Sequence, residues 1–150
     1  MAAIKILIAD DHELFRRSLR SLIEDRSDWR VCGEAVDGRE AVTKARELRP
    51  DLILMDVSMP EMNGLEASRR IREHAPDANI LIVSQNDPAQ MEKAARKVGA
   101  RGFVPKSRIS QELVPAVDRI TKNEGTKPAG GPNRGLRFAN VRGTQLLAND

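Results

Sequence analysis

Short, unbroken runs of Ile, Leu and Val recur along the first 105 residues of the chain, and each run stops at a polar or turn-forming residue. These runs cover residues 4–9, 51–55, 78–83 and 101–104. Strands that helices cover on both faces are apolar throughout, whereas half-exposed strands alternate. The runs therefore predict buried parallel strands. A more polar run, residues 30–36, predicts a strand at the edge of the same sheet.

Amphipathic segments separate the apolar runs, with apolar residues at the i, i+3, i+4 and i+7 spacing of helices that bury one stripe. Their apolar residues are Phe15, Leu19, Leu22 and Ile23; Ala41, Val42, Ala45 and Leu48; Leu65 and Ile71; Met91, Ala94, Ala95 and Val98; and Leu113, Ala116, Val117 and Ile120. Strand and helix thus alternate five times. This order predicts the α/β class, with a five-stranded, doubly wound parallel sheet and helices on both faces.

Two helix starts and one irregularity are predicted from local sequence. Asp87 followed by Pro88 is typical of a capping side chain and a first helical residue, so we expect the fourth helix to begin there. Ser110 is the expected cap of the fifth helix. Pro115 would lie inside that helix, where it removes a hydrogen bond, so we expect a kink or a delayed start.

Charge and composition divide the chain near residue 123. Residues 1–120 contain equal numbers of basic and acidic residues, so the formal net charge of +3 comes from residues 121–150. Residues 124–135 are rich in Gly and Pro and show no apolar periodicity, which is typical of a linker. We therefore predict a folded domain in residues 1–123 and a flexible, basic tail in residues 124–150.

The chain offers no disulfide framework and no membrane segment. Its one cysteine, Cys32, lies in an apolar stretch, as expected for a buried thiol in a reducing compartment. The apolar stretch before Asp10 is short and interrupted by Lys5, too little for a signal peptide or a membrane span. We expect a cytoplasmic protein that does not interact with membranes.

Polar side chains follow four of the predicted strands. Asp10 and Asp11 follow the first strand, Asp56 ends the third, Ser84 follows the fourth and Lys106 follows the fifth. Ligands of open parallel sheets bind outside the carboxyl ends of the strands. We therefore expect these five side chains to converge on one site.

The three carboxylates predict a Mg²⁺ site. Like charges a few ångströms apart repel unless a cation lies among them, and Mg²⁺ prefers oxygen ligands. We expect Asp10, Asp11 and Asp56 to surround the ion and the backbone carbonyl of Ser58 to supply a further oxygen.

Asp56 is the candidate nucleophile of the site. A carboxylate between a metal ion and an ammonium group can attack phosphorus, and phosphoryl transfer requires mainly alignment and charge neutralisation. Lys106 would pair with Asp56 or with a phosphoryl group on it, and the Ser84 hydroxyl would donate to a phosphoryl oxygen.

At these residues the chain resembles the response-regulator receiver domains of two-component signalling, over residues 4–121. The acid pair, the phosphoacceptor, the turn MPEMNG, the switch hydroxyl and the lysine occur in the family's order. The stretches IKILIADDHELFRRSLRSLIE and VCGEAVDGREA look like the NarL/LuxR-type subgroup. The resemblance implies a CheY-like, flavodoxin-like fold with strand order 2-1-3-4-5 and a sensor histidine kinase or phosphotransfer protein as phosphodonor. It also implies that Asp11 and Asp56 bind Mg²⁺ directly, with Asp10 as a supporting acid.

The resemblance further implies a conformational switch. Phosphorylation of Asp56 would draw Ser84 inward and make room for Phe103, which stands where the family often has tyrosine. The fourth helix, fifth strand and fifth helix would form the signalling face, which is also a candidate homodimer surface.

Gln85 replaces a usually small residue beside the site, and Ser107 replaces a frequent proline, so we expect a trans peptide bond after Lys106. The subgroup's helix-turn-helix output domain has no room in 150 residues.

Several alternatives stay open. Asp11 alone would suit a helix cap, Phe103 is equally well explained as a core residue, and His12 is interpreted as a partly exposed residue in the first helical turn rather than a ligand. A DNA-binding transcriptional regulator, truncated or acting through the basic tail, is one alternative function, although DNA binding is not expected without an output domain. A Mg²⁺-dependent aspartyl-phosphate phosphatase is another, but that family has an acid where this chain has Ser58.

Overall fold

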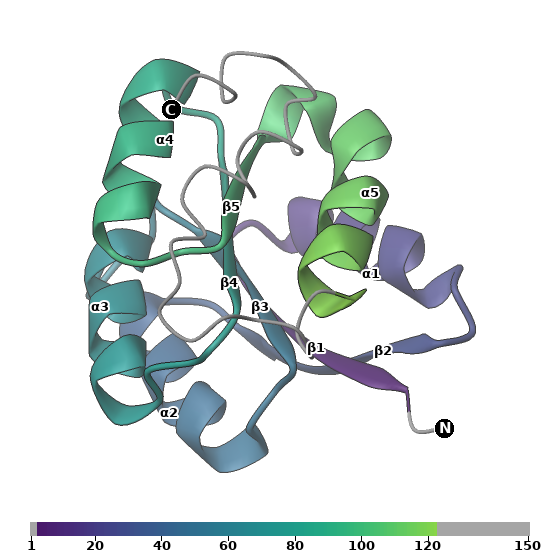
Figure 1. Ribbon diagram of the computed structural model, residues 1–150, viewed down its shortest axis with the longest axis horizontal. Helices are drawn as coiled ribbons and strands as arrows, with labels where there is room; N and C mark the ends of the chain where they lie inside the picture. The colour runs from purple at the N-terminus through teal and green to yellow at the C-terminus, as the bar shows by residue number, and fades with distance from the viewer. Residues whose placement is uncertain (1–2, 123–150) are drawn as a thin grey trace.

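The computed structural model describes residues 3–122, which form a five-stranded parallel sheet flanked by helices (Figure 1). The elements are β1 (Ile4–Ala9), α1 (Glu13–Glu24), β2 (Trp29–Ala35), α2 (Gly38–Leu48), β3 (Leu52–Asp56), α3 (Gly64–His74), β4 (Ile80–Ser84), α4 (Pro88–Lys97), β5 (Gly102–Pro105), the 3₁₀ turn η1 (Lys106–Arg108) and α5 (Ile109–Lys122). The strand order is β2-β1-β3-β4-β5. The predicted fold class and strand order are confirmed.

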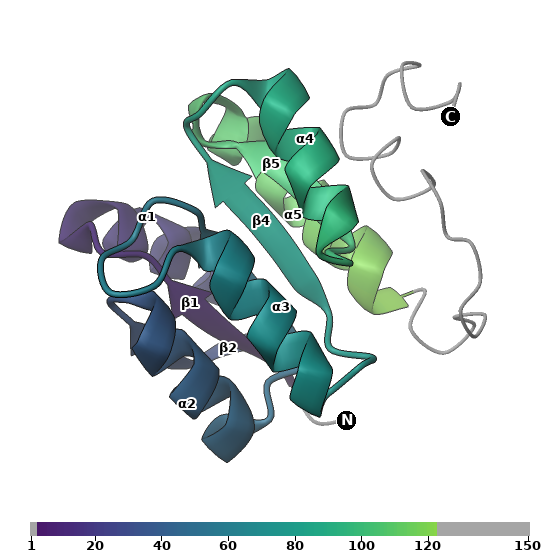
Figure 2. The same cartoon turned by 90° about the vertical axis from the view of Figure 1, so that its left-hand side faces the viewer.

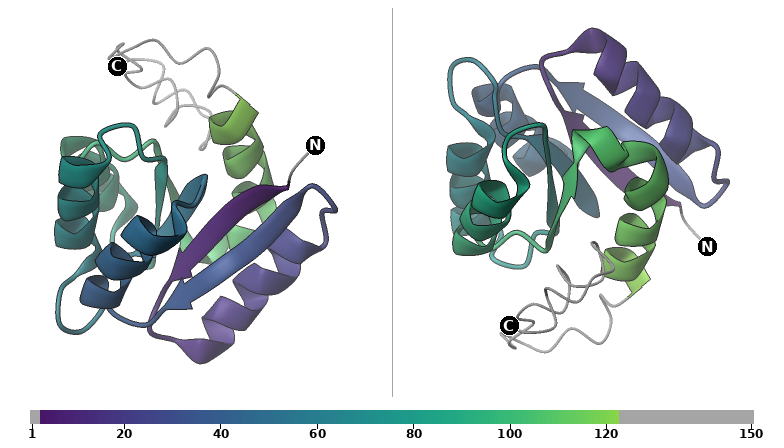
Figure 3. Two further views of the ribbon diagram at one scale, coloured as in Figure 1. Left: turned by 90° about the horizontal axis from the view of Figure 1, so that it is seen from below. Right: turned by 90° about the horizontal axis from the view of Figure 1, so that it is seen from above.

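Two hydrophobic cores lie on opposite faces of the sheet. Helices α2, α3 and α4 cover one face, and α1 and α5 cover the other (Figures 2 and 3). Successive strand residues point to opposite faces, so Leu7 and Ile53 belong to the first core, whereas Ile6 and Leu54 belong to the second. Because both faces are covered, most positions of β1, β3 and β4 are apolar, apart from Lys5 and the strand-end residues Asp56 and Ser84.

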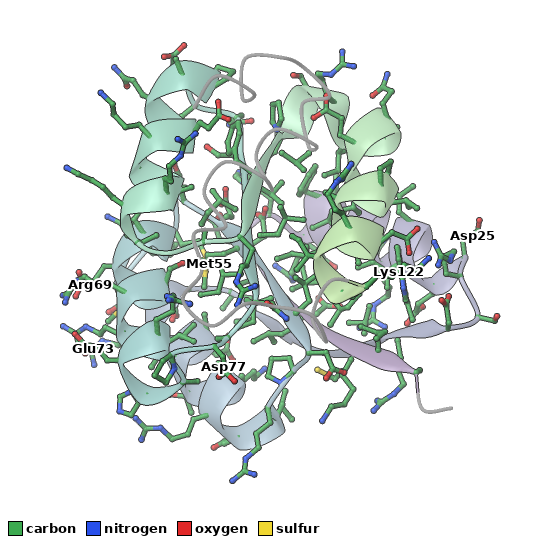
Figure 4. The ribbon with its side chains drawn as sticks, viewed as in Figure 1. Asp25, Met55, Arg69, Glu73, Asp77 and Lys122 are labelled. Carbon is green, nitrogen blue, oxygen red and sulfur yellow. The ribbon has the colours of Figure 1, made fainter. Side chains whose placement is uncertain are left out.

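The surface of α3 contrasts with this interior. Met55 of β3 is fully buried, whereas Arg69 and Glu73 project outward from α3 and form an exposed ion pair of 3.0 Å (Figure 4). Exposed pairs of this kind add little stability. The free energy of folding therefore comes chiefly from the two cores.

The strand predicted to lie at an edge does so. β2 pairs with β1 alone, and its burial is mixed, with Arg30 exposed between the buried Trp29 and Val31. The register with β1 shifts between Ile6 and Leu7, which leaves Cys32 without a partner in that register. The greater polarity of this run reflects its edge position.

The predicted helix boundaries are partly correct. Asp87 caps α4 by accepting a hydrogen bond from the Gln90 amide, and Pro88 is the first helical residue, as expected. The prediction for α5 was wrong, because the helix begins at Ile109 and includes Ser110. A preceding 3₁₀ turn leads directly from β5 into this helix, so no serine cap is needed. Pro115 lies inside the helix and does not delay its start.

Two further expectations concern the ends of the chain and the membrane. The predicted basic tail, residues 124–150, lies outside the described residues, and the boundary at residue 123 stays a prediction. Within residues 3–122, none of the helices combines the length and apolar character that crossing a bilayer requires.

Candidate functional site

Asp56 is the last residue of β3, at the point where the strand meets the start of α3. Its side chain is buried, with the residue only 3% exposed. The following turn contains Glu61 with a positive φ of 67° and ends at Asn63, whose side chain caps α3. A Cβ at Gly64 would lie 1.9 Å from the Asp56 carbonyl oxygen, so only glycine lets the helix start this close to the strand.

Lys106 reaches into the site from the end of β5 and lies between two carboxylates. Its Nζ is 2.8 Å from Asp10 Oδ2 and 3.5 Å from Asp56 Oδ1. The ammonium group also lies 4.3 Å from the centre of the Phe15 ring, a cation–π contact from α1. The expected pairing of Lys106 with Asp56 is therefore present, but the shorter contact goes to Asp10.

The neighbours of the Asp56 carboxylate have opposite effects on its pKa. Burial, followed by the negative charge of Asp10, raises the pKa of Asp56 from 3.8 to about 6, while Lys106 opposes this shift. Asp56 Oδ2 is buried and has no hydrogen-bond partner among the described residues. An unpaired buried carboxylate oxygen is costly, so this atom is suited to receive a cation or to react.

Asp11 and His12 complete a cluster around Asp56. One ligand atom from each of Asp10, Asp11, His12 and Asp56 lies within 4.8 Å of the other three. Asp10 and Asp56 are buried, whereas Asp11 and His12 are exposed, so the cluster opens to solvent on one side. Three carboxylates with one unpartnered oxygen fit a hard divalent cation such as Mg²⁺, which retains water on its open side.

Three other predicted site residues lie on β4, on β5 and in the turn after β3. Ser84 ends β4, is buried, and accepts a hydrogen bond on Oγ from the Asn86 amide at 3.0 Å. A hydroxyl that accepts one hydrogen bond retains its own proton to donate. Ser58 is exposed two residues beyond Asp56. Phe103 is fully buried, within the core under α2, α3 and α4.

Sequence reasoning missed two side chains at the site. Phe15 was assigned to the buried stripe of α1, yet its ring also contacts Lys106. Arg16 donates from Nη1 to the Asp10 carbonyl oxygen at 2.8 Å and from Nε to Glu34 Oε1 at 2.7 Å. A helical position alone gives no signal for either contact.

A groove of about 550 Å³ adjoins the cluster. It is lined by His12, Leu14, Phe15, Ser18, Gln85, Lys106 and Ser107. Leu14 is 75% exposed, an unusual position for a large apolar side chain, and Gln85 is also exposed.

No cis peptide bond occurs among the described residues, so the expected trans bond after Lys106 is confirmed.

Comparisons with known proteins agree with this fold. The family model described as "Response regulator receiver domain" matches residues 6–118. The chain is 38% identical over 118 residues to the chemotaxis protein CheY of Thermotoga maritima, covering 79% of this chain and 98% of that protein. A LuxR-family two-component response regulator from Aurantimonas has a crystal structure that matches with a TM-score of 0.78 and 34% identity, covering 95% of this chain and 100% of that one.

A third relative is longer than this chain. The response regulator protein VraR of Staphylococcus aureus is 35% identical over 121 residues, which cover 81% of this chain but 58% of VraR. The chain thus spans little more than half the length of some of its curated relatives, and the similarity is confined to one domain.

Proposed function

This chain belongs to the response regulator receiver family of two-component systems, and we propose that its Asp56 accepts a phosphoryl group from a phosphohistidine of a sensor kinase or phosphotransfer protein. One observation carries the proposal. The buried Asp56 carboxylate has an unpartnered Oδ2, a lysine 3.5 Å from Oδ1 and two further acids at the same sheet edge. A nucleophile flanked by a cation site and an ammonium group is the arrangement that phosphoryl transfer requires.

Mg²⁺ would occupy the space between Asp11 and Asp56, with Asp10 as a supporting acid and the Ser58 carbonyl as a further oxygen ligand. The carboxylate donor set and the orphan oxygen of Asp56 support this assignment. The bound ion would neutralise charge on the transferring phosphoryl group. The Lys106 ammonium group would contact a phosphoryl oxygen in place of Asp56. Its 2.8 Å contact with Asp10 would keep the lysine side chain in position.

The signal would pass from Ser84 to the face formed by α4, β5 and α5. Ser84 Oγ would donate a hydrogen bond to a phosphoryl oxygen, pulling the end of β4 toward Asp56. Phe103 lies on the neighbouring strand, where it pairs with Ile82 and is fully buried. A shift of β4 would change the packing around this ring and bias the two-state face. That face is also our candidate for homodimerisation.

The phosphodonor would dock over the N-terminal end of α1. The exposed Leu14 and the adjoining groove lie beside Lys106 and Gln85, at the open side of the acidic cluster. A helical histidine-bearing domain could place an apolar stripe on Leu14 and its phosphohistidine above Asp56.

The first experiment is phosphorylation by acetyl phosphate with and without Mg²⁺, followed by intact mass. We expect a Mg²⁺-dependent phosphoryl adduct on the wild type and none on Asp56→Asn. Asp77→Asn is the matched control, because Asp77 is exposed in the loop before β4. An equal adduct on Asp56→Asn would exclude Asp56 as the acceptor. If the wild type takes no adduct but Gln85→Ala does, access past Gln85 is the obstacle.

Docking is tested with a sensor kinase that phosphorylates the wild type. Leu14→Ser should slow transfer from the kinase and leave labelling by acetyl phosphate unchanged. Val36→Ser is the control, because Val36 is the other large apolar side chain exposed among residues 3–122 and lies outside the groove. If both variants slow phosphotransfer from the kinase equally, Leu14 is not part of the docking surface.

The alternative functions have separate readouts. A phosphatase would turn over a small phosphomonoester with Mg²⁺, whereas a receiver gives a single adduct per chain. Ser58 is exposed and is not an acid, so the site lacks the second carboxylate that such a phosphatase would use. DNA binding through residues 124–150 would weaken steeply with salt and disappear on truncation at residue 123.

A further inference from the structure

The imidazole of His12 lies beside the three carboxylates, although Mg²⁺ prefers oxygen ligands to nitrogen. His12 is the N-cap residue of α1, but its side chain caps nothing. Instead, its Nδ1 hydrogen-bonds to Asp10 Oδ1 at 3.3 Å and lies 3.4 Å from Asp11 Oδ1. The ring therefore points back into the cluster, although its side chain is 59% exposed.

The two oxygens of Asp10 have different partners. Oδ2 is held by Lys106 Nζ at 2.8 Å, while Oδ1 faces His12 and accepts a hydrogen bond from the His12 amide at 2.8 Å. Lys106 thus balances part of the negative charge and keeps Oδ1 turned toward the imidazole. The orphan Oδ2 of Asp56 is a further buried oxygen of the cluster.

The two distances from His12 Nδ1, which are those of a hydrogen bond and an ion pair, are also compatible with a tetrahedral metal site. Zn²⁺ binds imidazole nitrogen and carboxylate oxygen at about 2.0–2.2 Å, which places neighbouring ligand atoms of a tetrahedron roughly 3.3–3.6 Å apart. His12 Nδ1 already lies at such a distance from one oxygen of each of its two acidic neighbours. Octahedral Mg²⁺, at about 2.1 Å from its ligands, places adjacent ligand atoms only about 3.0 Å apart and prefers oxygen.

We propose that His12, together with Asp10, Asp11 and Asp56, forms a site for a divalent transition metal of the Zn²⁺ type, and that this metal competes with Mg²⁺ for the carboxylates. Imidazole nitrogen is a borderline ligand that selects Zn²⁺, Ni²⁺ or Cu²⁺ over Mg²⁺. The inference builds on the proposed function, because it uses the same carboxylates, but it concerns the fourth ligand and the metal selected.

The sequence allows a clean test. The chain contains two histidines, His12 and His74, and residues 123–150 contain neither histidine nor cysteine. His74 lies at the end of α3, where Nδ1 contacts the Arg70 carbonyl and Nε2 contacts Arg46. The single cysteine, Cys32, lies on β2, and burial raises the pKa of its thiol, which disfavours thiolate ligation.

The experiment is calorimetric titration of the full chain and of His12→Phe and His74→Phe with Zn²⁺ and, separately, with Mg²⁺. We expect Zn²⁺ affinity to fall at least about tenfold in His12→Phe, because loss of a direct ligand exceeds the cost of losing an outer-shell partner. His74→Phe should bind Zn²⁺ like the wild type, and all three chains should bind Mg²⁺ alike. Excess Mg²⁺ should displace Zn²⁺ competitively.

Two spectroscopic readouts on the wild type do not depend on the variants' folding. Co²⁺ in the site should give the intense visible absorption of tetrahedral coordination, and the ¹⁵N shift of His12 Nδ1 should change on Zn²⁺ binding. Equal Zn²⁺ affinity in wild type and His12→Phe, or an unchanged Nδ1 shift, overturns the inference. Zn²⁺ binding through His12 without phosphorylation would overturn only the proposed function, and the reverse result would overturn only this inference.

Discussion

At the residue scale, the site contains a carboxylate that the fold holds in an unfavourable state. Asp56 is 3% exposed, has one orphan oxygen and lies near the negative charge of Asp10. Lys106 compensates this charge only in part, because its shorter contact is with Asp10. A buried anion of this kind costs folding free energy, which a bound cation or a covalent modification recovers.

This cost predicts a pH-dependent effect of Asp56→Asn. The pKa of Asp56 is raised from 3.8 to about 6 in the folded state, so the folded protein binds the proton more tightly than the unfolded chain. The stability that protonated Asp56 contributes is present below pH 4 and is lost as the pH rises to about 6. Because Asn carries no charge, its advantage over Asp should be about 2 kcal/mol larger at pH 7.5 than at pH 4.

Urea denaturation in Mg²⁺-free buffer measures this difference. Asp77→Asn is the control, since Asp77 is exposed to solvent and its variant should follow the wild type at both pH values. A constant difference between Asp56→Asn and the wild type from pH 4 to 7.5 would mean that burial does not perturb this carboxyl group.

At the element scale, the junction between β3 and α3 depends on close backbone approach. Gly64 donates its amide hydrogen to the Val57 carbonyl at 2.9 Å, and a Cβ there would lie 1.9 Å from the Asp56 carbonyl. The helix start therefore fixes the backbone of the proposed phosphoacceptor. Asn63 reinforces the junction, because its side chain accepts from the Leu65 and Glu66 amides.

Gly64→Ala should destabilise the fold by about 3 kcal/mol or more, since backbone atoms must move to relieve the overlap. Gly33→Ala is the matched comparison. Its Cβ would meet Leu48 Cδ1 at 2.7 Å, the end of a flexible side chain, so we expect a cost of about 1 kcal/mol. Thermal denaturation of both variants decides between them, and similar losses would disprove the special role of the β3–α3 junction.

Helix α5 carries a defect of its own. Pro115 is exposed and lies in the interior of Ile109–Lys122, where it cannot donate to the carbonyl of Gln111 four residues earlier. The helix continues through this residue because Leu113, Ala116, Val117 and Ile120 are buried against the sheet. Tertiary packing thus overrides the local preference.

Pro115→Ala should raise the free energy of unfolding by about 1–3 kcal/mol, since alanine restores the missing hydrogen bond and removes the steric clash of the ring. The midpoint of urea denaturation should rise with an unchanged slope. A lower midpoint would show that the irregularity at Pro115 is needed for the packing of α5.

At the scale of the whole molecule, the proposed chemistry and the single tryptophan lie at opposite ends of the sheet. Trp29 begins β2, whereas Asp10 and Asp56 lie at the carboxyl ends of β1 and β3. Trp29 is 4% exposed, and the centre of its ring lies 4.1 Å from the Arg26 guanidinium carbon. Its environment is set by the core under α1 and α5.

Trp29 emission should therefore change strongly on unfolding and little when Mg²⁺ and acetyl phosphate are added. Fluorescence titration, read beside intact mass, tests this expectation. A large emission change that accompanies the adduct would mean that phosphorylation rearranges the molecule as far as the start of β2, beyond the face of α4, β5 and α5.

The sequence by itself determined the sheet and which of its strand ends carry polar side chains. Apolar runs that end in Asp10, Asp56, Ser84 and Lys106 specify which strand ends carry polar groups, and parallel strands bring those ends together whatever the details of packing. The edge position of β2 followed in the same way, because a strand with one neighbour tolerates polar residues.

Only the tertiary structure decided how these groups are paired. The closer approach of Lys106 to Asp10, the Phe15 ring beside it and the inward turn of His12 depend on side-chain contacts that join α1, the residues after β1 and the turn η1. Ser110 failed as a predicted cap for a related reason, since the 3₁₀ turn after β5 sets the start of α5. Periodicity is a property of one segment, whereas ångström-scale contacts join segments far apart in the chain.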